Sequence, residues 1–230
     1  MERDPIHLGL EWYYRHRQLG VDVNADEVAA YLSDAWDTAV QDDQMSFASP
    51  AEEHVLMRQA ISLITTYLQQ VPGDEPKPLA VETRFETPLI DPGDGEDLGI
   101  PLLGIVDLVA QSNDGPIIAD IKTTARGGRP HDVVHEIQLS CYSYLFRHAS
   151  GTPESSLEIR SLVKTKTPRL EVHQHQARTD AHFRRLFAVI RAYLDDLDSQ
   201  RFIFRPGLGC QMCDFRDSHC LQWSGTTPQV

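Results

Sequence analysis

The feature that most constrains the fold is a predicted β-hairpin whose apolar strands carry three charged residues. Asp107 lies within the run GIVDLV, and Asp120 and Lys122 lie within the run IIADIK that follows a short polar turn. A two-residue turn at Asn113-Asp114 would pair Asp107 with Asp120, whereas a turn at Asp114-Gly115 would pair Asp107 with Lys122. Because strand side chains alternate with period two, either register predicts that all three charged groups share one face of the hairpin.

Two neighbouring carboxylates in an apolar setting repel one another, so a divalent cation between Asp107 and Asp120 would stabilise the pair. Oxygen ligands favour Mg²⁺ or Mn²⁺, which also accept phosphate oxygens, so the site indicates phosphodiester hydrolysis. Lys122 would hold or deprotonate the attacking water, or stabilise charge on the phosphate. The alternative is an edge hairpin whose charges are solvated. Three aligned charges among Ile, Val and Leu residues favour the metal site.

The segment after the hairpin predicts a helix that carries Gln138 and Tyr142 four residues apart, on one helical face. Asp107, the tripeptide Asp120-Ile121-Lys122 and the pattern Gln138-x-x-x-Tyr142 together resemble the PD-(D/E)XK nuclease superfamily. Within it, the resemblance is to the RecB/AddB-like nuclease domains and the related CRISPR-associated adaptation exonucleases. It implies that the glutamine and the tyrosine support the active site and the DNA strand.

The resemblance also implies that His7, near the start of the opening helix, binds the metal, and that the backbone carbonyl of Ile121 joins the ligands. Glu82 and Glu86, in an upstream strand, lie on the same face as each other, and family members often carry a glutamate near this place. A solvated strand face explains both glutamates equally well, so the predicted site does not include them.

Three of the four cysteines lie near the C-terminal end: Cys210, Cys213 and Cys220. This spacing is typical of metal ligands, and no signal peptide is evident, which favours a reducing compartment such as the cytoplasm. The resemblance implies a [4Fe-4S] cluster whose fourth cysteine precedes the opening helix, yet no cysteine occurs before Cys141. Three explanations stay open: a missing upstream segment, a fourth ligand other than cysteine, or zinc with His219 as a donor.

Capping residues and apolar periodicity predict three helices, at residues 5–17, 24–36 and 49–70, before strands at 79–87, 100–110 and 116–123. A helix at 135–146, strands at 156–164 and 170–175, and a long helix from 179 follow. This order predicts an α/β fold with a mixed central sheet flanked by helices, of the restriction-endonuclease-like type that the resemblance implies. We expect a single domain over 1–230, with a helical region at 1–75, a catalytic core at 76–200 and a cysteine-containing tail at 201–230.

The formal net charge of −13 contrasts with the clustered Lys and Arg residues that a DNA-binding surface needs. A local basic groove would reconcile the two. Its candidates all lie in predicted loops or strand ends: Lys122, Arg126, Arg129, Lys164, Lys166 and Arg169. No apolar run reaches transmembrane length, so the sequence predicts a protein of the cytoplasm.

The sequence therefore predicts a Mg²⁺- or Mn²⁺-dependent DNA exonuclease or end-processing nuclease. Its pathway would be DNA repair, recombination or CRISPR-type adaptation, with helicase or recombination proteins as partners. The alternative is a catalytically silent, metal-stapled subunit that binds DNA or partner proteins in a larger recombination assembly. In the nuclease hypothesis the metal ligands are His7, Asp107, Asp120 and Ile121, and the catalytic residues are Asp107, Asp120, Lys122, Gln138 and Tyr142.

Overall fold

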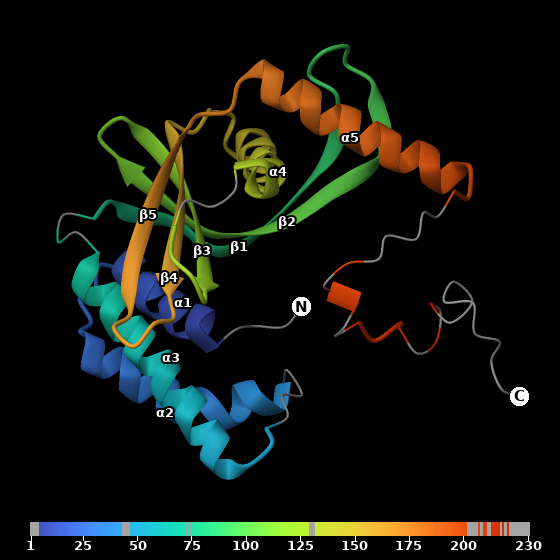
Figure 1. The fold of residues 1–230 in the computed structure, drawn as a ribbon. Coiled ribbons are helices and arrows are strands. Elements are labelled where there is room, and N and C mark those ends of the chain that lie inside the picture. Colours follow the sequence, from blue (N-terminus) through green and yellow to red (C-terminus); the bar gives the residue numbers. More distant parts are fainter. Residues whose placement is uncertain are drawn as a thin grey trace, which may run out of the picture. The chain divides into compact units, whose positions relative to one another are not determined.

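The computed structural model describes residues 5–42, 47–71, 73, 75–128, 132–201, 207, 209–210, 213–216, 218 and 220. Their centre is a five-stranded sheet with the order β1-β2-β3-β4-β5 (Figure 1). Neighbouring strands run antiparallel except for β3 and β4, which are parallel, so the predicted mixed sheet is confirmed. The strands are β1 (Lys77–Ile90), β2 (Asp97–Ser112), β3 (Gly115–Thr124), β4 (Ser156–Val163) and β5 (Arg169–Gln176).

In the described part of the chain, five helices come before, between or after the strands. Three of them precede the sheet: α1 (Pro5–Gln18), α2 (Ala25–Asp42) and α3 (Pro50–Gln70). Helix α4 (Asp132–Ser150) lies between β3 and β4 in the chain, and it supplies the long crossover that a parallel strand pair requires. Helix α5 (Asp180–Asp198) follows β5. The predicted order of helices and strands is therefore confirmed among the described residues.

Helices α2 and α3 each begin at a capping residue. The side chain of Asn24 accepts hydrogen bonds from the N–H groups of Asp26 and Glu27, at 2.9 and 3.0 Å. In return, the N–H of Asn24 donates to the Glu27 carboxylate at 2.8 Å, which completes a capping box. At the start of α3, the Ser49 hydroxyl accepts from the N–H of Glu52 at 3.2 Å. These bonds satisfy N–H groups that have no partner within the helix.

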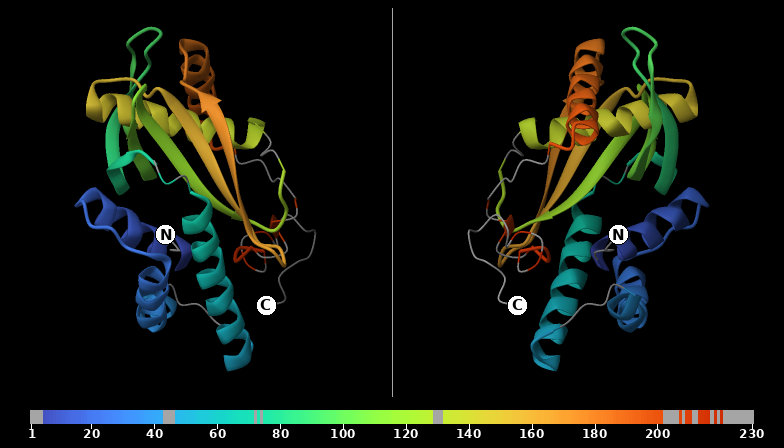
Figure 2. Two further views of the ribbon diagram at one scale, coloured as in Figure 1. Left: turned by 90° about the vertical axis from the view of Figure 1, so that its left-hand side faces the viewer. Right: turned by 90° about the vertical axis from the view of Figure 1, so that its right-hand side faces the viewer.

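The sheet separates two apolar layers, and Figures 1 and 2 show α1, α2 and α3 on one side of it and α4 on the other. On the side of α1–α3, Leu108 and Ile121 pack against the helices in the larger cluster of buried side chains. On the side of α4, Val109, Ile118 and Ile159 pack with residues of that helix. The two faces of β3 therefore contact different helices, so the position of a polar residue on this strand determines which helices its side chain can contact.

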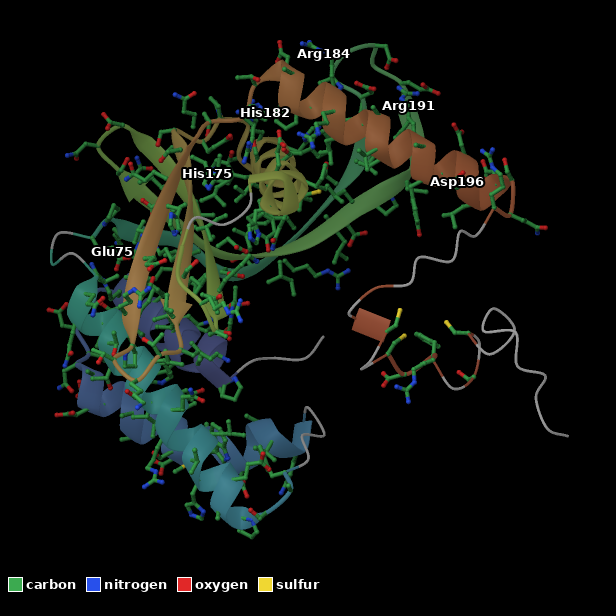
Figure 3. All side chains as sticks on the ribbon, viewed as in Figure 1. Glu75, His175, His182, Arg184, Arg191 and Asp196 are labelled. Atoms are coloured by element: carbon green, nitrogen blue, oxygen red, sulfur yellow. The ribbon has the colours of Figure 1, made fainter. Side chains whose placement is uncertain are left out.

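A buried ionic network lies on the side of α1–α3. Arg160 of β4 is 5% exposed, and it donates to the hydroxyls of Tyr14 and Tyr67 and to the carboxylate of Glu75. Its Nε atom donates to Glu158 at 2.9 Å. Glu75, which is labelled in Figure 3 and precedes β1, also accepts a hydrogen bond of 2.7 Å from the Tyr14 hydroxyl. The network joins α1, α3, β4 and the segment before β1, so every buried charge in it has a partner.

The chain divides into two compact units, residues 1–186 and 187–230, and the boundary falls within α5. The sheet, α1–α4 and every predicted catalytic residue belong to the first unit, whereas Cys210, Cys213 and Cys220 belong to the second. The expectation of one domain over the whole chain stays a prediction. In the described residues, no helix combines the length and the apolar character needed to cross a membrane.

Candidate active site

The predicted hairpin forms in the first of its two registers. Ser112 pairs with Gly115, so Asn113 and Asp114 are the two turn residues. The ladder runs from this turn as far as the pair Leu108 and Ala119. Extended by one residue, this register would set Asp107 of β2 opposite Asp120 of β3, which is the first of the two predicted alternatives.

Beyond this point the ladder between β2 and β3 ends, and a side chain takes the place of a backbone acceptor. The N–H of Ile121 donates to Oδ2 of Asp107 at 2.7 Å. Strand β3 meanwhile stays paired with β4 as far as Thr124. The carboxylate of Asp107 is therefore held at the place where β2 leaves β3.

A local distortion of β1 and β2 also influences the direction in which the Asp107 side chain points. The β1–β2 ladder keeps one register on either side of Glu82 and Asp107, but it omits that pair. Glu82 has a φ of 42°, in the left-handed region that residues other than glycine seldom adopt. Val106 and Val109 pack on the side of α4, whereas Leu108 packs on the other side. Strict alternation would place Val106 and Leu108 on the same side of the sheet. The alternation from which the position of Asp107 was predicted therefore fails between these two residues, although Asp107 still lies near Asp120.

The distortion brings three ligand-type atoms together. One atom each from His7, Glu82 and Asp107 lie within 4.8 Å of one another, and all three residues are half-buried. His7 Nδ1 lies 3.2 Å from Oε1 of Glu82. The structure thus brings His7 beside two carboxylates, and its role as a metal ligand stays a prediction. Glu82, which sequence reasoning left out, is the third member of this group.

The group is electrostatically crowded. Burial raises the pKa of Asp107 from 3.8 to about 7, and the charges of Asp120 and Glu82 push the pKa in the same direction. The charge of His7 and the hydrogen bond from the N–H of Ile121 oppose that rise. Nearby carboxylates of this kind are stabilised by an opposite charge.

Asp120 belongs to a second group, on the side of α4. It is 2% exposed, and its Oδ2 atom lies 2.9 Å from Nζ of Lys122 without the geometry of a hydrogen bond. Gln138 of α4 connects the two residues, because its Nε2 donates to Asp120 Oδ1 and its Oε1 accepts from Lys122, both at 3.0 Å. The predicted proximity of Asp120 and Lys122 on one strand face is thus present in the structure.

Tyr142 lies one helical turn beyond Gln138, as the sequence spacing predicts. Its hydroxyl accepts a hydrogen bond of 2.9 Å from Gln138 Nε2. Burial raises the pKa of Tyr142 above its ordinary value, and the negative charges of Asp107 and Asp120 raise it further. The hydroxyl therefore stays protonated at neutral pH and keeps a proton to donate.

His135, in the first turns of α4, is a further neighbour that sequence reasoning did not select. Burial lowers its pKa, and the positive charge of nearby Lys122 lowers it further. Its position three residues before Gln138, on a similar helical face, is the signal that could have identified it.

The donor atoms fit a hard divalent cation. One imidazole and several carboxylates are the ligand types that Mg²⁺ and Mn²⁺ accept, and no thiol is among them. The buried Oδ2 of Asp120 also accepts no hydrogen bond. Ile121 lies between Asp120 and Lys122, at 4% exposure.

The C-terminal cysteines are not brought together in the same way. Cys210, Cys213 and Cys220 are partly exposed and carry free thiols, and among the described residues they do not form a group at metal-ligand spacing. His219 lies outside the described residues. Cys141 is separate, on α4, where burial raises the pKa of its thiol to about 11.

Comparison with known proteins gives a family match at the level of sequence. The profile of the PD-(D/E)XK nuclease superfamily matches residues 5–218 of the chain. This match spans His7, the hairpin, α4 and two of the three C-terminal cysteines. No curated protein sequence matches significantly.

One solved structure shares the fold, and another is similar at a lower score. The crystal structure of a candidate exonuclease from Eubacterium rectale is 12% identical in sequence, with a TM-score of 0.51, and the match covers 91% of this chain and 77% of that chain. The structure of the protein SSO0001 is 14% identical, with a TM-score of 0.45 and coverage of 91% and 94%. At such low identity the first of these likenesses concerns the fold alone.

Proposed function

The chain belongs to the PD-(D/E)XK nuclease superfamily, and we propose that it is a metal-dependent deoxyribonuclease that hydrolyses phosphodiester bonds at or near DNA ends. The observation that carries the proposal is the convergence of two groups of residues where β2 leaves β3. His7, Glu82 and Asp107 form the first group, and Asp120 with Lys122 forms the second.

Four side chains and one carbonyl would hold the metal in this proposal. His7, Glu82 and Asp107 supply the group within 4.8 Å. Asp120 supplies the Oδ2 atom that accepts no hydrogen bond, and Ile121 supplies its backbone carbonyl. A bound Mg²⁺ or Mn²⁺ would offset the negative charge that develops on the phosphate oxygens and would make a water more acidic.

Lys122 would act on the substrate directly, and its neighbours would hold it in place. An ammonium has three donors. That of Lys122 donates to Oδ1 of Asp120 at 3.3 Å and to Gln138 at 3.0 Å, which leaves one donor for a phosphate oxygen or the attacking water. Gln138 holds Asp120 and Lys122 in place, and Tyr142 anchors Gln138 from the next turn of the helix. Fixed donors near a reacting phosphate stabilise its developing charge without reorganising.

The test is the digestion of end-labelled single- and double-stranded DNA across a series of Mg²⁺ and Mn²⁺ concentrations. We expect metal-dependent loss of label from the parent protein and none from Asp107→Asn. Asp114→Asn is the matched control, because Asp114 is an exposed aspartate in the turn of the same hairpin. An Asp107→Asn protein that digests DNA at the parent rate contradicts the proposal. A parent protein that binds DNA but never cuts it supports the silent subunit instead.

The substrate would be single-stranded DNA or DNA with free ends, in repair, recombination or CRISPR-type adaptation, with a helicase or another recombination protein as partner. Exonuclease action would appear as the progressive release of mononucleotides or short fragments from one labelled end. Cleavage of a closed circular single strand at a similar rate would indicate an endonuclease instead.

A second metal is proposed for the C-terminal cysteines, a structural [4Fe-4S] cluster or zinc, in a protein of the cytoplasm. Clustered thiols in a reducing compartment commonly bind metals. Cys210 and Cys213 have the CxxC spacing, and Cys220 follows. Protein purified without oxygen should show the visible absorption of iron–sulfur, or contain zinc by elemental analysis, and Cys213→Ser should lose it. Protein with neither metal contradicts this part of the proposal.

A further inference from the structure

We propose that the sheet edge formed by the end of β3 and the β4–β5 turn binds the phosphate backbone of the nucleic-acid substrate next to the active site. This edge, called the basic edge here, carries Arg126, Lys164, Lys166 and Arg169. The inference rests on the proposed nuclease function, and it adds the surface by which the substrate reaches the site.

Parallel pairing brings these residues together, although they come from segments about forty residues apart in the sequence. Strands β3 and β4 are parallel, so their C-terminal ends lie at the same edge of the sheet. The N–H of Lys164 donates to the carbonyl of Thr124 at 2.7 Å, just beyond the last paired residues. Arg169 begins β5 and pairs with Val163. In Figure 1 the end of β3 and the β4–β5 turn occupy the same end of the sheet.

The local charge is opposite in sign to that of the whole protein. The chain has 34 acidic and 21 basic residues. In the segments 122–128 and 164–171, by contrast, the basic residues are Lys122 and the four of the basic edge, and the acidic residue is Glu171. Arg126, Lys164 and Lys166 are exposed, and in the described part of the chain their side chains are not paired with carboxylates. A basic surface on an acidic protein favours a polyanion as its partner.

The backbone of the edge is held in a defined shape. Gly128 has a φ of 125°, and its N–H donates to the Glu171 carboxylate at 2.8 Å. That bond is the main reason why the pKa of Glu171 is lowered, and the bonds from Arg169 add to the effect. A side chain at Gly127 would collide with the guanidinium of Arg169. The single acidic residue of the edge therefore fixes the loop after β3 against β5.

The basic edge lies within reach of the reacting groups. Lys122 and Thr124 are two residues apart on β3, and a strand rises about 3.3 Å per residue, so the edge begins about 7 Å from Lys122. A nucleic-acid strand whose scissile phosphate sits at Lys122 would thus place the next phosphates over the edge. Contacts of this type position the strand and do not read its sequence.

The test compares two double variants that lose the same positive charge. Lys164→Ala with Lys166→Ala removes half of the basic edge, whereas Arg58→Ala with Lys77→Ala removes exposed residues of α3 and β1. The binding of a short fluorescent single-stranded oligonucleotide is measured by anisotropy, without added divalent metal, over a series of salt concentrations. Cleavage by the same proteins is measured separately with Mn²⁺.

Loss of two phosphate contacts on a single strand should reduce the steepness with which the logarithm of the binding constant falls with the logarithm of the salt concentration by about 1.4. If binding at about 1 M salt is unchanged, this corresponds to about a 25-fold loss of affinity at about 0.1 M salt. The control should bind within about twofold of the parent. Equal binding by the edge variant and the parent overturns the inference, and so does a parent that binds polyglutamate but no oligonucleotide. A parent that binds through the edge but never cuts refutes the nuclease proposal alone. A parent that cuts while the edge variant binds normally refutes only the present inference.

Discussion

The N–H of Ile121 donates a hydrogen bond of 2.7 Å to the side chain of Asp107, at the point where the ladder between β2 and β3 has ended. A backbone donor that would normally meet a neighbouring strand meets an acidic side chain instead. The same hydrogen bond therefore marks the end of the ladder and fixes the position of the Asp107 carboxylate.

Glu82→Gln should weaken metal binding. In the group with His7 and Asp107, a neutral amide would replace one of the anionic ligands. We expect the Mn²⁺ concentration for half-maximal cleavage to rise by about tenfold or more, and Mn²⁺ affinity measured by calorimetry to fall in parallel. Glu86→Gln is the control, because Glu86 lies on the same strand, is exposed and pairs with Arg84. Equal effects from the two substitutions would contradict a ligand role for Glu82.

Tyr142→Phe should slow the reaction more than it weakens substrate binding. The substitution removes the hydroxyl that accepts from Gln138 at 2.9 Å, so Gln138 would hold Asp120 and Lys122 less firmly. Loss of such a supporting bond typically reduces activity by about 10- to 100-fold. Steady-state kinetics should show the change in kcat with KM nearly constant. Tyr193→Phe, at a tyrosine that is 62% exposed, should leave both parameters unchanged.

Arg160→Met should strongly destabilise the protein. It would remove the cation that pairs with the carboxylates of both Glu75 and Glu158, each 6% exposed, and would leave only Arg17 beside Glu75. Breaking a buried ion pair in this way costs about 3–5 kcal/mol. Urea unfolding measures the change. Arg84→Ala breaks an exposed pair and should cost less than about 1 kcal/mol. A small effect of Arg160→Met would mean that Arg17 alone can neutralise Glu75.

The same network should make the protein sensitive to alkali. Burial raises the pKa of Tyr67 from 10.0 to about 12, and burial also raises the pKa of Tyr14. Because both values are higher in the folded state, folding favours the protonated hydroxyls. Their contribution is complete below about pH 10, the pKa of unfolded tyrosine, and is lost as the pH rises towards 12. The free energy of unfolding should fall over this range, and less steeply in Tyr67→Phe. If the free energy of unfolding falls equally steeply with pH in the parent and in Tyr67→Phe, then Tyr67 does not titrate over this pH range.

The sequence predicted the part of the site that lies on regular elements. Asp120 and Lys122 are two apart on a strand that keeps its alternation, and Gln138 and Tyr142 are four apart on a helix, so spacing alone places each pair. The turn was predicted as two alternatives, and the structure has Asn113 and Asp114 in it. The order of elements followed in the same way from caps and periodicity.

Other parts depended on features that spacing cannot reveal. Glu82 joins the site because its backbone leaves the β region, and period-two reasoning could not separate it from Glu86. The pairing of Arg160 with Glu75 and Tyr14 joins residues 85 and 146 positions apart. Local patterns carry no information on such distant contacts. The arrangement of the cysteines also stays a prediction from spacing.

Arg160 and Ile121 are paired across β3 and β4, so the ionic network lies directly behind the strand segment that presents Asp120 and Lys122. Loss of the ion pairs of Arg160 would therefore be expected to shift the backbone of β3 that carries Asp120 and Lys122. A substitution in this buried network, on the side of the sheet that faces α1 and α3, should therefore lower any activity of the site before it unfolds the whole protein.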